Sequence, residues 1–110
     1  MDIFQALGDK SRRNIIELLS KKGQLSSTDI SNQFHISAPA ISQHLKVLRE
    51  ANLVKMEKRA QQRLYKINPD AMEEIQKWIK RLTQFWDDRF LALDKLLEQQ
   101  KMKGGVKKNG

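Results

Sequence analysis

The sequence predicts a mainly α-helical fold with one small β-hairpin. Over most of the chain, apolar residues recur three or four positions apart, which is the period of a helix with one buried face. Between Leu53 and Ile67, apolar and polar residues instead alternate, which is the period of a strand. The chain has 110 residues, of which 39% are hydrophobic and only two are prolines. This size supports one domain with its own core.

Three short helices are expected in the first part of the chain. The first covers about residues 3–7 and ends at Gly8, a residue that favours a helix end. The second runs from about residue 11 to residue 22 and carries basic residues in its last turn, where they oppose the negative end of the helix. The third covers about residues 27–34, because Ser26 followed by Asp29 is typical of a helix start.

A fourth helix begins after Ser37, whose hydroxyl can accept hydrogen bonds from the free backbone amides of the first turn. Pro39 then falls in that first turn, where its missing N–H is not needed. Ile41, Leu45 and Leu48 form a single apolar stripe on this helix. Two helices joined by a tight turn, the second with a free polar face, make a helix-turn-helix.

The alternating segment predicts a hairpin of two strands, over residues 53–58 and 63–67, with residues 59–62 at its tip. The tip has no glycine, which favours a longer turn over a tight two-residue turn. A hairpin directly after a helix-turn-helix is the wing of a winged helix-turn-helix fold. We therefore expect one winged helix-turn-helix domain over residues 1–100.

Asn68-Pro69-Asp70 is typical of a helix start, and a long last helix can run to about Gln100. Its apolar residues are too many for so small a domain to bury, so a second copy of the chain is expected to cover them. The basic tail, residues 101–110, is expected to be disordered. The expected dimer contacts are Phe4, Leu7, Ile79, Leu82, Phe85, Trp86, Phe90, Leu93 and Leu97.

The net charge of +8 is concentrated around the predicted helix-turn-helix and hairpin. Residues 46–69 contain seven basic and two acidic residues, whereas residues 70–100 contain five basic and seven acidic residues. A basic segment beside a helix with a free polar face is the electrostatic pattern of a DNA-binding protein. A solvated lysine-rich surface is the alternative for the charge alone.

The composition also excludes several classes of protein. The chain has no cysteine, so it can form no disulfide, thiolate metal site or cysteine nucleophile. It has no apolar run of about 20 residues that could cross a bilayer, and no secretory signal is evident at its start. We expect a cytoplasmic protein without contact with membranes. No glycine-rich phosphate loop or catalytic serine–histidine–carboxylate set is recognisable, so an enzyme is not expected.

Two segments of the chain carry a resemblance to a known family. Residues 6–16, Ala-Leu-Gly-Asp-Lys-Ser-Arg-Arg-Asn-Ile-Ile, and residues 42–54, Ser-Gln-His-Leu-Lys-Val-Leu-Arg-Glu-Ala-Asn-Leu-Val, resemble the ArsR/SmtB family of bacterial winged-helix repressors. The resemblance implies a cytoplasmic homodimer, joined through its first and last helices. It also implies that the dimer represses transcription by binding an inverted repeat in double-stranded DNA.

The chain departs from the metal-sensing members of that family. Those members bind metals through a Cys-x-Cys pair on the third helix or through Asp and His on the last helix. Here the corresponding third-helix stretch, residues 24–29, is Gln-Leu-Ser-Ser-Thr-Asp, and the last helix has no histidine. We therefore expect no metal site and no cofactor, as in the metal-independent branch, some of whose members are autorepressors.

The expected DNA contacts fall in the fourth helix and the hairpin. Gln43 is the expected main base reader, because its amide can pair with adenine N6 and N7. Ser42 and His44 add base or phosphate contacts, although His44 can equally lie at the edge of the core. Ala38 and Pro39 are small enough to approach thymine methyl groups. The remaining expected contacts, mainly to phosphate or in the minor groove, are Ser37, Lys46, Arg49, Arg59, Gln61, Gln62 and Arg63.

Two alternatives remain open from the sequence. The basic hairpin and the long last helix could bind protein or RNA, in a module without sequence-specific DNA binding. Separately, Trp78, Phe85, Trp86 and Phe90 could line an apolar pocket for a small-molecule effector between subunits. An aromatic stripe at helical spacing is more typical of a plain interface.

Overall fold

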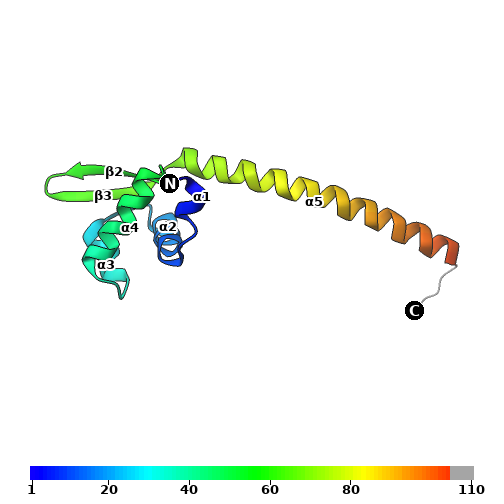
Figure 1. Ribbon diagram of the computed structural model, residues 1–110, viewed down its shortest axis with the longest axis horizontal. Helices are drawn as coiled ribbons and strands as arrows, with labels where there is room; N and C mark the ends of the chain where they lie inside the picture. Colours follow the sequence, from blue (N-terminus) through cyan, green and yellow to red (C-terminus); the bar gives the residue numbers. More distant parts are fainter. Residues whose placement is uncertain (105–110) are drawn as a thin grey trace. The chain divides into compact units, whose positions relative to one another are not determined.

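The computed structural model describes the backbone of residues 1–104 and the side chains of residues 1–100. It confirms the predicted winged helix-turn-helix fold, mainly helical with a small antiparallel sheet (Figure 1). The elements in chain order are α1 (Ile3–Ala6), α2 (Lys10–Lys22), β1 (Gln24–Ser26), α3 (Ser27–Gln33), α4 (Ala38–Glu50), β2 (Val54–Arg59), β3 (Gln62–Ile67) and α5 (Pro69–Gly104).

Strand β1 is an element that the sequence did not predict. It pairs antiparallel with β3, with Leu25 opposite Tyr65, so the described sheet has three strands in the order β1-β3-β2. Three residues are too few to show an alternating pattern, and the partner strand lies far along the chain. The strand exists because the folded chain brings β3 beside it.

The corner between α1 and α2 is fixed by side chains that bond to backbone. Asp9 caps α2 by accepting from the backbone N–H of Arg12 at 3.0 Å, which starts the helix one residue before the predicted start. Arg12 Nε donates to the carbonyl of Ala6 at 2.6 Å, and Arg13 Nη1 donates to the carbonyl of Leu7 at 2.7 Å. These bonds satisfy carbonyls at the end of a four-residue helix that has few intrahelical bonds.

Both helices of the helix-turn-helix begin directly after the serine that the sequence predicted at the helix start. Ser26 Oγ accepts from the backbone N–H of Asp29 at 3.0 Å, and Ser37 Oγ accepts from that of Ala40 at 3.3 Å. Both serines have extended backbone angles, as N-cap residues do. Phe34 also has an extended backbone and ends α3 at Gln33, one residue before the predicted end.

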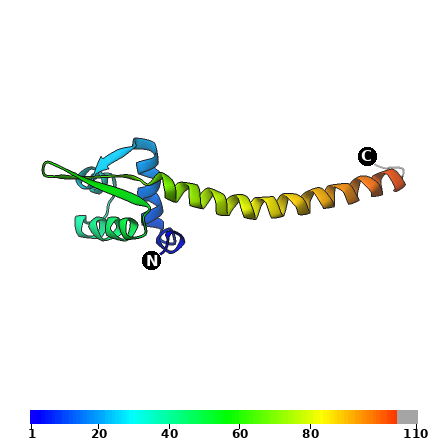
Figure 2. The same cartoon turned by 90° about the horizontal axis from the view of Figure 1, so that it is seen from above.

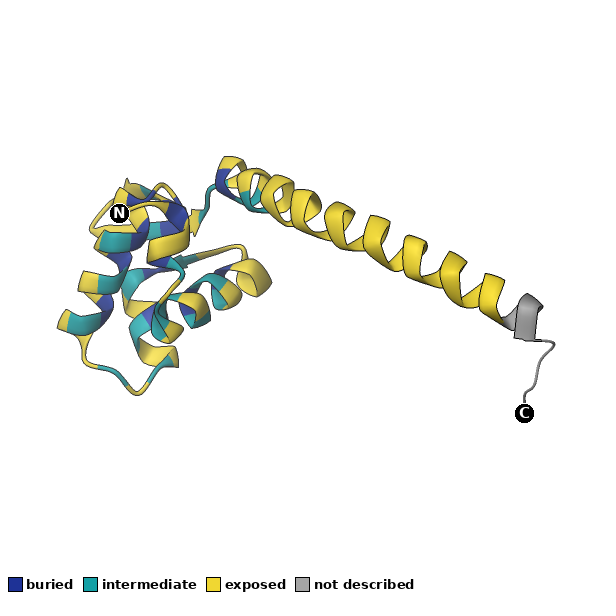
Figure 3. Ribbon diagram, turned by 45° about the vertical axis from the view of Figure 1, so that its right-hand side comes forward, coloured by how far each residue is buried: buried dark blue, intermediate teal, exposed yellow. Residues whose placement is uncertain are grey.

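The core of residues 1–74 is built from the predicted apolar stripes (Figure 3). The stripe of α4 is confirmed, because Ile41, Leu45 and Leu48 are each at most 1% exposed. The sheet contributes Val54 and Tyr65, which are also buried. The largest fully buried side chains are Ile15, Leu19, Ile30, Ile41, Leu45, Leu48 and Leu53.

The prediction of a long turn at the hairpin tip is wrong. Arg59 pairs with Gln62, so only Ala60 and Gln61 form the loop. Ala60 adopts a φ of 55°, in the left-handed region that favours glycine. The register of the hairpin places Met56 opposite Tyr65 on the buried face, and this pairing leaves two residues for the turn in spite of the unfavourable φ.

Helix α5 begins as predicted, with Asn68 Oδ1 accepting from the backbone N–H of Asp70 at 3.2 Å. It runs to Gly104, four residues past the predicted end, because no helix-breaking residue stands between Gln100 and Gly104. The rest of the predicted disordered tail, residues 105–110, lies outside the described residues. From Ile75 onward the chain forms a second unit. Within the described part of the chain, no helix is long and apolar enough to cross a membrane.

Candidate nucleic-acid interface

The outer face of α4 presents the residues that the sequence assigned to DNA. Ser42, Gln43 and Lys46 are exposed, on the side of the helix away from the buried stripe. Arg49 is also exposed, one turn after Lys46, so two basic side chains follow Gln43 along the helix. The arrangement offers a bidentate amide with two cations on its C-terminal side, which suits a base edge next to phosphates.

The start of α4 is also accessible. Ser37, Ala38 and Pro39 are exposed, and Ser37 serves as the helix cap. The first turn of α4 contains no acidic residue, so no side chain there offsets the positive end of the helix dipole. Helix α3, by contrast, carries Asp29 in its first turn. The start of α4 is therefore the better of these two helix starts for a phosphate.

His44 lies at the edge of the core, which is one of the two placements that the sequence allowed. The residue is half-buried, and its Nδ1 atom is buried without a hydrogen-bond partner among the described residues. Helix α4 packs against α1 and α2. The pKa of the Asp9 carboxyl at their corner is lowered first by the hydrogen bond from the Arg12 N–H, and the charge of His44 contributes less. Gln43 is exposed and His44 is half-buried, so Gln43 is the more accessible of the two candidates for a base contact.

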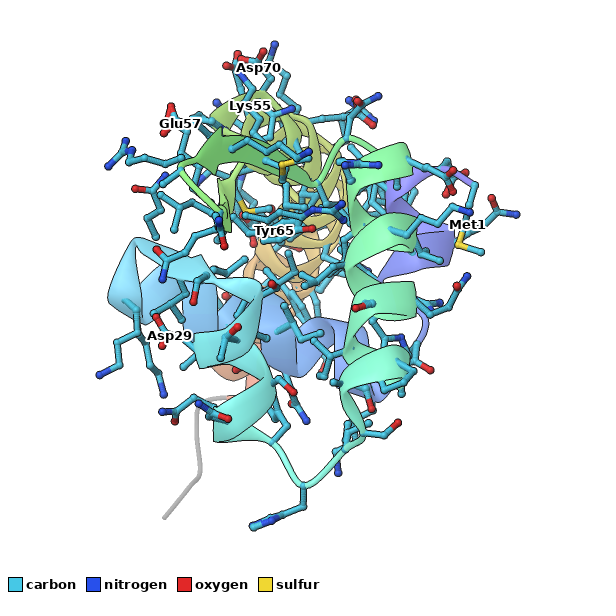
Figure 4. The ribbon with its side chains drawn as sticks, turned by 90° about the vertical axis from the view of Figure 1, so that its left-hand side faces the viewer. Met1, Asp29, Lys55, Glu57, Tyr65 and Asp70 are labelled. Atoms are coloured by element: carbon cyan, nitrogen blue, oxygen red, sulfur yellow. The ribbon has the colours of Figure 1, made fainter. Side chains whose placement is uncertain are left out.

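The two faces of the hairpin differ in what they contact. Tyr65 lies on the side of the helices, whereas Lys55 and Glu57 lie on the opposite side (Figure 4). Side chains alternate along a strand, and directly paired residues share a face. Lys58, two residues beyond Met56, and its partner Arg63 therefore lie on the helix side. Both are exposed, because they lie past the buried part of that face.

Arg59 lies on the other face and is already engaged. Its Nη2 donates to Glu57 Oε2 at 2.6 Å, and the two side chains are 67% and 54% exposed. This ion pair occupies the guanidinium that the sequence assigned to phosphate or to the minor groove. Gln61 and Gln62 are exposed at the tip, as that assignment requires.

The hairpin tip extends beyond helices α3 and α4 in both views (Figures 1 and 2). A projecting hairpin can contact a duplex outside the segment that α4 contacts. The exposed face of α4, the hairpin tip and the helix side of the hairpin thus form one candidate interface. We define it as Ser37, Ala38, Pro39, Ser42, Gln43, Lys46, Arg49, Lys58, Gln61, Gln62 and Arg63.

Lys58 is the one member of this interface that the sequence analysis did not single out. Lys58 belongs to the interface because it pairs directly with Arg63. The long turn that the sequence predicted did not determine which residues of the two strands pair. The alternation of Met56 and Lys58 gave the available signal, because it predicts that both side chains share a face.

The predicted dimer contacts on α5 are exposed in the single chain (Figure 3). Their exposed fractions range from 43% for Leu82 to 59% for Phe85. The rings of Trp86 and Phe90 stack with centroids 5.8 Å apart, and the guanidinium of Arg89 lies 4.6 Å from the Phe85 ring centroid. In the other unit, Phe4 is 38% exposed and Leu7 is half-buried. Among the described side chains, no group of three His, Asp or Glu residues could hold a metal ion.

Comparison with known proteins gives one consistent result. The model of the family "Bacterial regulatory protein, arsR family" matches residues 9–56. Transcriptional repressor SdpR of Bacillus subtilis is 33% identical over 78 residues, which cover 71% of this chain and 86% of that protein. HTH-type transcriptional regulator Rv2034 of Mycobacterium tuberculosis is 32% identical over 97 residues, covering 88% and 87%. A solved structure of a possible transcriptional regulator for arsenical resistance is similar with a TM-score of 0.68 and 30% identity, covering 84% and 95%.

Proposed function

The chain belongs to the arsR family of bacterial DNA-binding transcriptional regulators, and from this premise we propose that it is a homodimeric repressor that binds an inverted-repeat operator. The observation that carries the proposal is the exposed face of α4, where Gln43 lies outside the core and the basic residues Lys46 and Arg49 follow it along the helix. A bound dimer represses by occupying promoter DNA, and SdpR, similar to this chain, is named a repressor. Its place of action is the cytoplasm, where its DNA lies.

Each half of the dimer reads one half-site. Helix α4 enters the major groove, where Gln43 pairs with a base edge and Ser42 contacts a base or a phosphate. Ser37, Lys46 and Arg49 hold the flanking phosphates, and their contacts set the register of the helix in the groove. Ala38 and Pro39 approach the bases at the start of the helix. The hairpin supplies further backbone contacts beyond the groove.

The apolar stripe of α5 supports the homodimer. Ile75, Trp86 and Leu97 recur every 11 residues, and Ile79 and Leu82 have their counterparts 11 residues later in Phe90 and Leu93. An 11-residue repeat has 3.67 residues per turn, close to the period of a straight helix, so the stripe stays on one side without left-handed supercoiling. A stripe of this length on one side of a helix suits a second helix of the same kind.

Helix α2, together with Leu7 just after α1, offers a second surface to the partner subunit. Leu7 and Ile16 line a hollow of about 460 Å³, with Lys10, Arg13 and Glu17 also lining it. A hollow with apolar and charged lining can receive a side chain of a second copy. We assign the aromatic residues of α5 to the same interface rather than to an effector pocket, since Trp86 already stacks on Phe90 and Arg89 lies over Phe85.

Selection of bound duplexes from a random pool tests the DNA assignment. The expected result is a palindrome whose half-sites lie about one helical turn apart, roughly 34 to 36 Å. Binding is expected to fall steeply with salt. A pool that shows no enrichment would contradict sequence-specific binding and favour the alternative of a protein- or RNA-binding module.

Sedimentation equilibrium of the full chain tests the dimer. Trp86→Glu places a charge in the stripe and is expected to yield monomers, whereas Leu91→Glu is the matched control, because Leu91 is 59% exposed but lies off the stripe. Trp86→Glu is also expected to abolish cooperative binding to the palindrome. Equal masses for the two variants would contradict the assigned interface.

A further inference from the structure

We propose that Lys58 and Arg63 form a clamp in the hairpin that holds a single backbone phosphate of the operator, an inference that rests on the proposed function. The register places the two residues directly opposite each other in the antiparallel pair of β2 and β3. They carry the same charge, and like charges directly opposite each other destabilise a hairpin. The free protein thus holds two cations together at the site where the hairpin projects.

Neither cation of the clamp is neutralised within the chain. Among the described residues, neither Lys58 nor Arg63 makes an ion pair, whereas Arg59, next to Lys58, is paired with Glu57. The strand alternation explains the difference, because Glu57 and Arg59 share the outer face, and Lys58 and Arg63 share the face on the helix side. Both cations are therefore free to bind an external anion.

The spacing and position of the two side chains favour one phosphate as that anion. Cβ atoms of directly opposite residues lie about 4.5 to 5.5 Å apart, so the longer ammonium and guanidinium arms can converge on one group. A phosphate accepts bidentate bonds from a guanidinium and takes the ammonium as a point charge. The clamp lies on the sheet face that contacts the helices, and the hairpin tip projects beyond α4. It thus lies on the same side of the sheet as the reading helix.

A second pair of basic residues in the same hairpin provides a matched control. Lys55 lies opposite Lys66, with the same total charge, but on the outer face of the sheet. Both residues are exposed. A general attraction between DNA and a basic hairpin involves the two pairs alike, whereas a phosphate clamp involves only Lys58 and Arg63.

The test measures the affinity of the full chain for a fluorescein-labelled duplex selected from the random pool, between about 0.05 and 0.2 M salt. We compare Lys58→Gln, Arg63→Gln, the double variant, and the double variant Lys55→Gln with Lys66→Gln. The clamp variant with both changes is expected to bind about fivefold more weakly at 0.15 M salt. Its plot of log affinity against log salt is expected to flatten by about one phosphate equivalent. The outer-face variant is expected to change the slope far less.

The single variants decide whether one phosphate is shared. If it is, the losses are coupled, and the double variant loses less affinity than the product of the two single losses. A slope that falls by about two in the double variant would instead mean two independent phosphates, and it would overturn the clamp. So would an unchanged affinity in Lys58→Gln.

Stability of the free protein supplies the second readout. Removing either charge relieves the repulsion, so Lys58→Gln and Arg63→Gln are expected to melt at or above the temperature of the unchanged chain at low salt. A structural role would lower both stability and affinity, and that result would overturn the clamp. If the unchanged chain bound no duplex, the proposed function and the clamp would both fall. If it bound and the clamp variant kept its full salt slope, only the clamp would fall.

Discussion

The side-chain amide of Asn68 donates a hydrogen bond to the backbone carbonyl of Asn52, with 2.8 Å between Nδ2 and O. The backbone N–H of Asn68 also donates to the carbonyl of Leu53 at 2.9 Å. Asn52 follows α4 with a φ of 62°, the left-handed conformation that Asn and Gly adopt after many helices. Asn68 precedes α5, so these bonds join the two ends of the hairpin, between α4 and α5.

We predict that Asn68→Ala lowers the free energy of unfolding by about 1 to 2 kcal/mol, because it removes both the bond to Asn52 and the cap of α5. Asn68→Asp keeps an acceptor for the backbone N–H of Asp70 but cannot donate to Asn52. Urea unfolding at one protein concentration measures both. Both variants lose the bond to Asn52 and only Asn68→Asp keeps the cap, so Asn68→Asp is expected to lose less stability than Asn68→Ala. No loss in either variant would contradict the assigned tie.

A second prediction concerns the two-residue turn of the hairpin. Ala60→Gly is expected to raise the free energy of unfolding by about 0.5 to 1 kcal/mol, because glycine adopts a positive φ without strain from a Cβ atom. Ala60→Val is the matched opposite, and it is expected to be destabilising at the same φ. Thermal melting of the two variants checks the sign, and a melting temperature that falls in Ala60→Gly would contradict the strain.

The elements that the sequence predicted correctly are those with local signals. Ser26, Ser37 and Asn68 cap helices through bonds to residues two or three positions later, so a short stretch of sequence contains the whole interaction. The stripe of Ile41, Leu45 and Leu48 is likewise local to one helix. These local signals predict where α4 begins and which of its faces is exposed.

The features that the sequence did not reveal depend on distant pairing. Strand β1 is formed by pairing with β3, and the place of Lys58 depends on which residue of β3 lies opposite it. The engagement of Arg59 depends on the length of the turn, because the two-residue turn extends β2 to Arg59, where strand alternation places it on the face of Glu57. Register is a property of the folded sheet, so the candidate site was predicted in α4 and only partly in the hairpin.

Gln43 and Lys46 are expected to respond differently to alanine. Gln43→Ala should reduce the preference for the selected operator over single-base variants by about 1 to 3 kcal/mol, because a bidentate amide contact is lost. Lys46→Ala should weaken binding to all duplexes about equally, because it contacts phosphate. Competition binding against a set of operator variants measures both. An unchanged preference in Gln43→Ala would remove its assigned role.

His44→Leu is expected to leave the base preference unchanged, since the imidazole is half-buried at the edge of the core. The buried Nδ1 has no partner among the described residues, so its removal is expected to keep the free energy of unfolding the same or raise it by up to about 1 kcal/mol. The same competition assay and urea unfolding test the two points. A changed base preference would return His44 to the reading surface.

Asp9 gives the chain an acid-sensitive component of stability. The hydrogen bond from the Arg12 N–H holds the pKa of Asp9 below its ordinary value of 3.8 in the folded chain. Its contribution to stability is therefore fully present above pH 3.8 and is lost as the pH falls through the lower folded pKa. Asp9→Asn keeps an acceptor for α2 but does not titrate.

Urea unfolding between about pH 2 and 6 should show that the unchanged chain loses stability relative to Asp9→Asn only below about pH 4. A constant difference across that range would mean that the folded and unfolded chains share one pKa for Asp9.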